Sequence, residues 1–309
     1  MSDNLKSRGI KAFFWDFFGK IATYGTTFIV SIFLARMLEP SDFGLIAMIM
    51  VIVTIAEVFT DVGLGAALIQ RRRLLPVHYS SVFYFNIFVG AILTLITYFS
   101  ASWIAHFYDS SELTPLVQVM SLTFLINSFS SLQNIKLRKE LNYALLTKTN
   151  FIASLISGVI GIFLAFYGAG VWSLVAQILL RGVIYNIIVW FAAKWTPALQ
   201  LSFKALIQLW GFGFRIFLSG LLEAIFSRLD YIVIGKLFAP ATLGYFERAK
   251  SLNFMINQLS AGSLMAVLFP MLSVIQNDLP RFQNAVIKAF GLISFVAFLL
   301  LGLTYVVSG

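Results

Sequence analysis

Nine stretches of this 309-residue sequence are almost continuously apolar. Each is close to the length of about 20 residues with which an α-helix crosses the hydrocarbon core of a membrane. Lipid offers the backbone no hydrogen-bond partners, so such a stretch must satisfy its own N–H and C=O groups as a helix. The charged fraction of 11% fits a membrane protein, because soluble domains carry about 25% charged residues. The predicted helices are Phe13–Met37, Gly44–Leu68, Ser80–Ile104, Leu113–Ile135, Asn150–Tyr167, Val171–Ala193, Trp210–Phe238, Ala241–Phe269 and Ala289–Val307.

An internal repeat divides these segments into two sets. The sequence SIFLARMLEPSDFGLIAM at residues 31–48 recurs as YIVIGKLFAPATLGYFER at residues 231–248, an offset of 200. In each copy a proline-bearing loop joins two apolar segments. A repeated half in a hydrophobic chain is typical of membrane transporters, whose substrate site lies between the halves. Identical pairs are Ile32/Ile232, Pro40/Pro240 and Gly44/Gly244, and conservative pairs are Ala35/Gly235, Arg36/Lys236 and Phe43/Leu243.

The repeat predicts how the chain is organised. Residues 1–196 form a first lobe of six transmembrane helices, residues 197–209 a cytoplasmic linker or interfacial helix, and residues 210–309 the first three helices of a second lobe. Helices one to three should then superpose on helices seven to nine. With this period a complete second lobe would extend to about residue 400, so the chain is expected to be a truncated form or fragment of a longer protein.

The loops between the predicted helices differ in charge. Loops on the side of the N-terminus hold fourteen Lys and Arg residues, whereas the opposite loops hold only Arg36 and Lys236. Cytoplasmic loops of membrane proteins carry such an excess of basic residues. The N-terminus is therefore predicted to be cytoplasmic. The net charge of +9 is mainly a topology signal and does not indicate nucleic-acid binding.

Twelve charged residues fall within or beside the apolar segments. A charge at the centre of a membrane helix costs about 2.5 to 3.5 kcal/mol on insertion scales, so such residues normally face a bundle interior or an aqueous cavity. Arg181 lies on predicted helix six, and the other eleven lie on helices one, two, seven and eight. Since the repeat relates these four helices, we expect a hydrated cavity between two pseudo-equivalent lobes.

These charges are the candidate site residues. Glu57 and Asp61 lie four residues apart on one helix face, where two like charges need a cation or a proton. The candidate substrate-binding residues are Arg181, Arg215, Lys20, Arg228, Arg248 and Lys250, and the candidate coupling or cavity carboxylates are Glu57, Asp61, Glu223 and Asp230. Structural alternatives are a snorkelling Asp16/Lys20 pair, a solvated helix end at Glu247, Arg248 and Lys250, and interfacial anchors at Arg36 and Lys236.

Motifs of soluble enzymes are missing from the sequence. It contains no phosphate-binding loop, GxSxG, HExxH or dinucleotide fingerprint. With no cysteine and two histidines, disulfides, thiolate metal sites and a cysteine nucleophile are excluded. We expect no catalytic residues, cofactor or metal. An integral-membrane glycosyltransferase or polymerase is left open by motif absence, and the repeat argues against it.

Five segments together resemble a known family. They are Gly9–Trp15, LARMLEPSDFGL at 34–45, DVGLGAALIQ at 61–70, DYIVIGKLFAPATLGYFERA at 230–249 and LFPMLSVIQND at 268–278. The chain resembles polysaccharide flippases of the multidrug, oligosaccharidyl-lipid and polysaccharide exporter (MOP) superfamily, especially bacterial exporters of the Wzx and colanic-acid type. Such exporters have twelve to fourteen helices, whereas this sequence predicts six plus three.

The resemblance implies an all-α, two-lobed flippase of the bacterial cytoplasmic (inner) membrane. Its substrate would be an undecaprenyl-pyrophosphate-linked oligosaccharide repeat unit for exopolysaccharide, O-antigen or capsule synthesis, moved outward by alternating access. Cavity arginines and lysines would then bind the pyrophosphate and acidic sugars. The membrane potential, or H⁺ or Na⁺ acting through a carboxylate, would drive transport. Polysaccharide polymerase or assembly proteins are the expected protein partners.

Two further functions remain open. A cation-coupled exporter of small amphipathic drugs would share the superfamily fold. A non-transporting scaffold of the polysaccharide assembly complex would instead keep export intact after the deep charges are neutralised.

Overall fold

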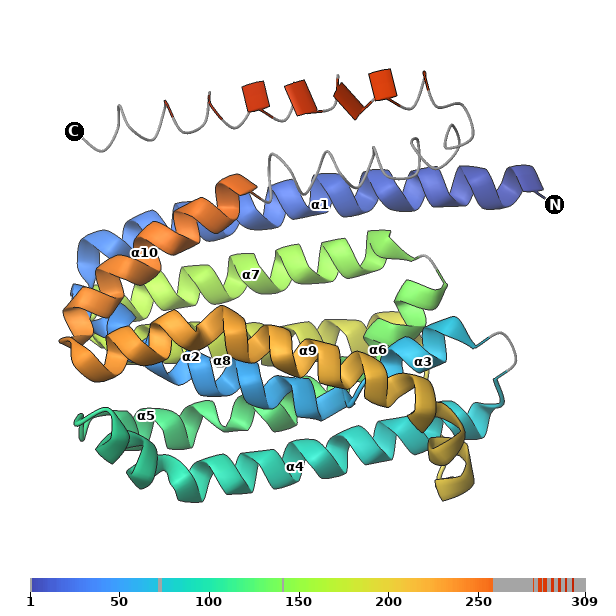
Figure 1. Cartoon of the computed structure of the whole chain (residues 1–309), viewed down its shortest axis with the longest axis horizontal. Coiled ribbons are helices and arrows are strands. Elements are labelled where there is room, and N and C mark those ends of the chain that lie inside the picture. Colours follow the sequence, from blue (N-terminus) through green and yellow to red (C-terminus); the bar gives the residue numbers. More distant parts are fainter. Residues whose placement is uncertain are drawn as a thin grey trace. The chain divides into compact units, whose positions relative to one another are not determined.

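The computed structural model describes residues 2–71, 74–140 and 142–257, together with isolated helical residues between 280 and 302. Every regular element within these ranges is an α-helix. Residues up to Tyr245 belong to one compact unit and residues from Phe246 onward to a second. The helices, drawn in Figure 1, are α1 (Ser2–Met37), α2 (Pro40–Asp61), α3 (Leu64–Gln70), α4 (Pro76–Phe107), α5 (Leu113–Met120), α6 (Leu122–Lys139), α7 (Tyr143–Phe166), α8 (Val171–Ala193), α9 (Phe203–Leu237) and α10 (Pro240–Asn257).

Among the described residues, six helical spans are long and apolar enough to cross a membrane. They are α2, α4, α5 together with α6, α7, α8 and α9, which correspond to predicted helices two to seven. The apolar part of α1, Ile21–Met37, is shorter. The prediction of an all-α, multi-pass membrane protein is confirmed. The predicted eighth helix beyond Asn257, and the ninth apart from isolated residues, lie outside the described ranges.

Close packing of small residues holds α7 between α1 and α8, with which it shares two of the most extensive helix contacts. A Cβ added to Gly158 of α7 would lie 2.6 Å from Cγ2 of Val30, and one on Gly161 would lie 3.1 Å from Cβ of Gln177. Lipid tails are as apolar as leucine, so helices associate in a membrane through such close approach.

The repeat is visible in the backbone. α1 ends at Met37 and α9 at Leu237, and the following helices begin at Pro40 and Pro240. The hydrogen bond from the Leu38 N–H to the Leu34 carbonyl recurs 200 residues later, and so does the bond from Asp42 to Glu39. Proline suits the first turn of each second helix because its missing N–H would be unpaired there. The two connections therefore fold alike, as the repeat predicts.

The second predicted helix is interrupted near its C-terminal end. Val62 and Gly63 have φ angles of 43° and 72° and separate α2 from α3. Both carboxylate oxygens of Asp61 accept the Gly65 N–H, at 2.9 and 3.1 Å. At the other end of α3, Lys139 Nζ donates to the carbonyls of Leu68 and Arg71. Side chains thus satisfy the backbone groups that the interruption exposes.

The fourth predicted helix divides at Ser121 into α5 and α6. Ser121 Oγ donates to the Gln118 carbonyl at 2.7 Å, and Thr94 Oγ1 of α4 donates to the Ser121 carbonyl at 3.1 Å. The interruption is again satisfied by hydroxyl groups.

The predicted linker differs from the observed structure in its second half. Residues 203–209 form the first turns of α9, so the helix of predicted segment seven begins earlier than expected. The preceding stretch is held on α4 because Ser80 Oγ accepts the Ala198 N–H at 3.0 Å and Ser81 Oγ accepts the Ser202 N–H at 2.9 Å. Ser202 in turn caps α9 by accepting the Ala205 N–H.

Gly63 lets α9 approach the interruption of α2. A Cβ on Gly63 would overlap the Gly213 carbonyl oxygen, whereas Gly168, with φ 78°, has open space around it. In Gly168→Ala we expect only the cost of a left-handed residue, about 1 to 2 kcal/mol. Gly63→Ala should lower the stability of the folded protein clearly more than Gly168→Ala does, because α9 must also move away from the added Cβ. Thermal unfolding of both variants in detergent measures the difference, and equal losses would contradict the close contact.

Candidate functional site

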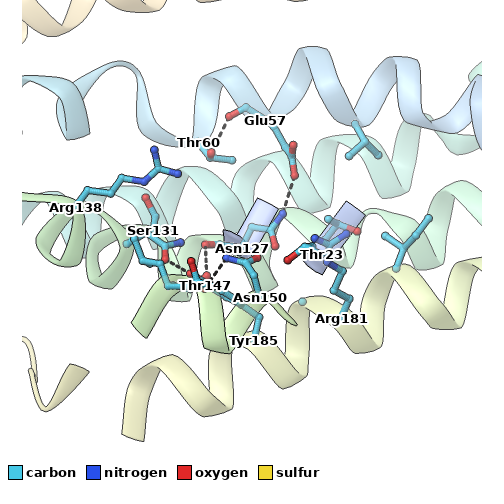
Figure 2. Close-up of a pocket in the computed structure, with 18 of the residues that line it drawn as sticks. Thr23, Glu57, Thr60, Asn127, Ser131, Arg138, Thr147, Asn150, Arg181 and Tyr185 are labelled. Carbon is cyan, nitrogen blue, oxygen red and sulfur yellow. Dashed lines mark hydrogen bonds between the residues drawn. The ribbon is translucent and has the colours of Figure 1, made fainter. Parts of the chain in front are cut away.

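A polar cavity of about 890 Å³ lies among five helices of the first unit (Figure 2). Its walls come from α1, α2, α6, α7 and α8. These helices are mostly apolar in sequence. The concentration of hydroxyl and amide groups around the cavity therefore distinguishes this region from the rest of the helix interfaces. The polar lining residues are Thr23, Tyr24, Glu57, Thr60, Thr123, Asn127, Ser130, Ser131, Asn134, Arg138, Tyr143, Thr147, Asn150, Arg181 and Tyr185.

Glu57 projects from α2 into the cavity and is held by α6. Asn127 Nδ2 donates to Glu57 Oε1 at 2.6 Å (Figure 2). Thr60, one turn later on α2, donates its hydroxyl to the Glu57 backbone carbonyl at 2.7 Å. A carboxylate can accept several hydrogen bonds, so the remaining lone pairs of Glu57 are available to a proton, a cation or a ligand hydroxyl.

Arg181 projects into the same cavity from α8 (Figure 2). Among the side chains that the structure describes, its guanidinium forms no ion pair or hydrogen bond, and Tyr24 of α1 interacts with it electrostatically. The side chain is exposed to the cavity rather than packed away. A guanidinium presents five N–H donors in a planar fork that matches phosphate or carboxylate groups.

The wall at the end of the cavity near Arg138 is a network of amides and hydroxyls. Tyr185 of α8 donates its hydroxyl to Asn134 of α6. Thr147 of α7 donates to the Trp15 carbonyl of α1 at 3.0 Å. Arg138, in the last turn of α6, is exposed. These contacts fix the polar wall across four helices, and their groups are the kind that bind the hydroxyls of a sugar.

Asp61 has a different place from the one predicted. Its carboxylate caps α3 through Gly65 and does not line the cavity. The two carboxylates of α2 therefore have different partners, although their spacing suggested that they share a cation or a proton. Among the described residues, no group of three or more His, Asp or Glu side chains is placed to hold a metal ion.

The predicted residues of α9 also lie apart from Glu57 and Arg181. We expected Arg215 and Glu223 to face one cavity between helices one, two, seven and eight, but no α9 residue lines the cavity described here. Arg215 and Glu223 are exposed, whereas Arg228 and Asp230 are half-buried. The Arg228 guanidinium lies 5.0 Å from the centre of the Tyr231 ring, and Asp230 accepts the Tyr231 N–H at 3.0 Å.

Three other candidates complete the set. The side chain of Lys20 lies outside the described part of the structure. Arg248 and Lys250 belong to the second unit, in which Lys250 Nζ lies 5.4 Å from the centre of the Phe246 ring.

A search confined to charges misses most of the cavity wall. The signal that identifies it is the polar run NSFSSLQN at residues 127–134, inside an otherwise apolar predicted helix. Asn127, Ser130, Ser131 and Asn134 of this run all line the cavity. Hydroxyl and amide groups cost less to bury than charges. Their presence in an apolar sequence is therefore a weaker indication of a polar site than a charged residue is.

Comparisons with known proteins agree with the sequence resemblance. Residues 33–309 match the family described as "Polysaccharide biosynthesis protein". The chain is 25% identical over 273 residues to the succinoglycan biosynthesis transport protein ExoT of Rhizobium meliloti (strain 1021), covering 88% of this chain and 55% of ExoT. It is 29% identical over 198 residues to the teichuronic acid biosynthesis protein TuaB of Bacillus subtilis (strain 168), covering 63% of this chain and 41% of TuaB.

Two further similarities extend over nearly the whole chain. The lipopolysaccharide biosynthesis protein WzxC of Escherichia coli (strain K12) is 22% identical over 314 residues, which cover 98% of this chain and 62% of WzxC. The solved structure of the MATE multidrug transporter DinF-BH has the same fold, with a TM-score of 0.60 and 17% identity over 98% of this chain and 75% of that one. The chain thus spans less than two thirds of the length of ExoT, TuaB and WzxC.

The cavity should be hydrated in the membrane. The sequence contains no cysteine, so a single introduced thiol reports on its own site. Asn150→Cys, on the cavity wall, should react with a hydrophilic maleimide. Leu155→Cys, on the same helix but on a face exposed outside the cavity, should stay unreactive in lipid because the reactive thiolate does not form there. Equal labelling of the two variants in membranes would contradict a water-filled cavity.

Proposed function

The chain belongs to the polysaccharide biosynthesis protein family, and from this premise we propose that it is part of a transporter for lipid-linked oligosaccharides. In this proposal the polar head of an undecaprenyl-pyrophosphate-linked repeat unit crosses from the cytoplasmic to the outer leaflet of the bacterial inner membrane. The lipid tail stays in the bilayer. The observation that carries the proposal is a hydroxyl- and amide-lined cavity that contains the guanidinium of Arg181, which forms no salt bridge with Glu57.

The chemistry of the cavity matches this class of substrate. Its amides and hydroxyls can exchange hydrogen bonds with sugar hydroxyls, and Arg181 can bind a phosphate or an acidic sugar as a planar fork. Arg138, in the last turn of α6, adds a second cation. With the N-terminus in the cytoplasm, Arg138 lies at the cytoplasmic end of the cavity, where the substrate would enter.

The charges of α9 and α10 have a related role in the proposal. They would contact the substrate from the side of the second lobe during alternating access. These residues are Arg215, Glu223, Arg228 and Asp230 on α9 and Arg248 and Lys250 on α10.

Glu57 is the proposed coupling group. Among the described side chains it is the carboxylate that lines the cavity, and Asn127 positions it without neutralising its charge. Protonation, or binding of Na⁺, would remove a negative charge from the cavity that receives the anionic substrate. Coupling through Glu57 would therefore favour substrate binding on one side of the membrane.

The similarity to a MATE transporter structure raises a second candidate, an exporter of small amphipathic drugs. That likeness concerns the fold. Such drugs need an apolar surface with few polar groups, whereas the cavity wall is dense in hydroxyls and amides and contains two arginines. The composition of the wall favours the oligosaccharide.

The first functional test concerns Arg181. In cells whose surface polysaccharide depends on this protein, Arg181→Ala should reduce export and accumulate lipid-linked repeat units on the cytoplasmic side. A hydrogen bond to a charged group contributes about 1.5 to 3 kcal/mol, which corresponds to roughly 10- to 150-fold in affinity. Arg181→Lys should restore export only in part, because a point charge replaces a planar fork.

Arg36→Ala is the matched control. Arg36 is exposed in the last turn of α1 and does not line the cavity. Its loss should leave export unchanged at equal protein levels. Normal export in Arg181→Ala would reject Arg181 as a substrate contact and would favour a scaffold role, whereas lost drug resistance with normal polysaccharide would favour the drug exporter.

The second functional test concerns Glu57. Glu57→Gln keeps an acceptor for Asn127 and removes the charge, so the fold should be retained while the dependence of transport on the proton or sodium gradient disappears. Asp61→Asn is the control, because its oxygen can still cap α3 and the residue lies outside the cavity. Transport by inverted membrane vesicles, with each gradient collapsed in turn, measures the effect. If transport by Glu57→Gln still depends on a gradient as in the unchanged protein, Glu57 is not the coupling group.

A further inference from the structure

The two copies of the repeat touch each other at one end of the first unit. A Cβ added to Gly44 would overlap the Pro240 carbonyl oxygen, and a Cβ added to Gly244 would overlap the Pro40 carbonyl oxygen. Each copy therefore gives a glycine to the contact and receives the proline carbonyl of the other. Figure 1 shows both connections at the same end of the helices.

Two further contacts lie next to this glycine–proline contact. Gly235 of α9 faces Tyr108 and Met48, and its added Cβ would lie 2.9 Å from Cε1 of Tyr108. Lys236 donates to Asp109 in the loop after α4, with Nζ 2.6 Å from Oδ2. This hydrogen bond lowers the pKa of the Asp109 carboxyl, so the carboxylate is charged at neutral pH. Both side chains are exposed, and an ion pair in water contributes little.

The opposite end of α9 is held differently. Gln208 Oε1 lies 3.2 Å from Nε2 of His78, which is buried at the start of α4, and the Gln208 carbonyl accepts from Arg71. Ser81 binds the Ser202 N–H just before α9 begins. The Gly63 and Gly213 backbones touch next to these hydrogen bonds. The start of α9 is therefore anchored on α3 and α4 by polar contacts as well as packing.

We propose that the reciprocal glycine–proline contact is a gate, and that α9 opens it by tilting about its anchored start. From Gly213 to Lys236 a helix spans about 35 Å at 1.5 Å per residue. A tilt of roughly 10° at the anchor would move the far end by about 6 Å, enough to separate contacts that rely on close approach. In the predicted orientation this gate faces the outside of the membrane.

The gate can be tested without any substrate, because the cysteine-free chain accepts paired thiols. Asp109→Cys with Lys236→Cys forms the gate pair, and His78→Cys with Gln208→Cys forms the anchor pair. A short bis-maleimide reagent should cross-link both pairs in membranes. Adding Gly44→Ala or Gly244→Ala should lower cross-linking of the gate pair by about 5- to 30-fold, the change that a shift of about 1 to 2 kcal/mol produces in a two-state equilibrium. The anchor pair should be unaffected.

Gly25→Ala is the matched control, because nothing lies within 4 Å of its added Cβ and the residue is on α1. Unchanged cross-linking of the gate pair in Gly44→Ala and Gly244→Ala would overturn the gate. Equal loss in both pairs would also overturn it, because the whole interface of α9 would then have loosened. Either result leaves the role of Arg181 and Glu57 untouched, since the cross-linking requires no transport.

Discussion

The structure depends on one constraint, which is that backbone hydrogen bonds must be satisfied where no water is available. Continuous helices meet it without help from side chains. At the two interruptions described here, side chains replace what the helix loses: Asp61 and Lys139 at the two ends of α3, and Ser121 with Thr94 between α5 and α6. An interruption is thus possible only where the sequence places a donor or acceptor beside it.

The same constraint explains which parts of the fold could be predicted. Long apolar runs determine where helices form, and the predicted segment Val171–Ala193 coincides with α8. The predicted ends of the first and seventh helices, Met37 and Phe238, lie within one residue of the observed ends of α1 and α9, because proline marks the first turn of the helix that follows. The interruption at Val62 and Gly63 could not be predicted, since it depends on the close approach of Gly213 from α9. The early start of α9 likewise depends on contacts with Ser80 and Ser81.

The candidate site was predicted in part for a related reason. A buried charge is conspicuous in an apolar sequence, so Glu57 and Arg181 were recognised, and both line the cavity. Sequence position alone does not tell which helix faces which, so their separation from Arg215 and Glu223 was not foreseen. The amides and hydroxyls of α6 are ordinary residues individually. They form a polar site only because the fold brings them together with residues of α1, α7 and α8 around one cavity.

The glycine–proline contact between the repeats has an evolutionary consequence. If the two halves arose by duplication, most equivalent positions became free to diverge, because each copy now has its own neighbours. Gly44 and Gly244 did not gain that freedom, since each one packs on the carbonyl of the other copy's proline. A larger side chain in one copy cannot be accommodated by a change within that copy. We therefore expect these connections to drift as a pair in related sequences, keeping their length and their glycine while the helices on either side change.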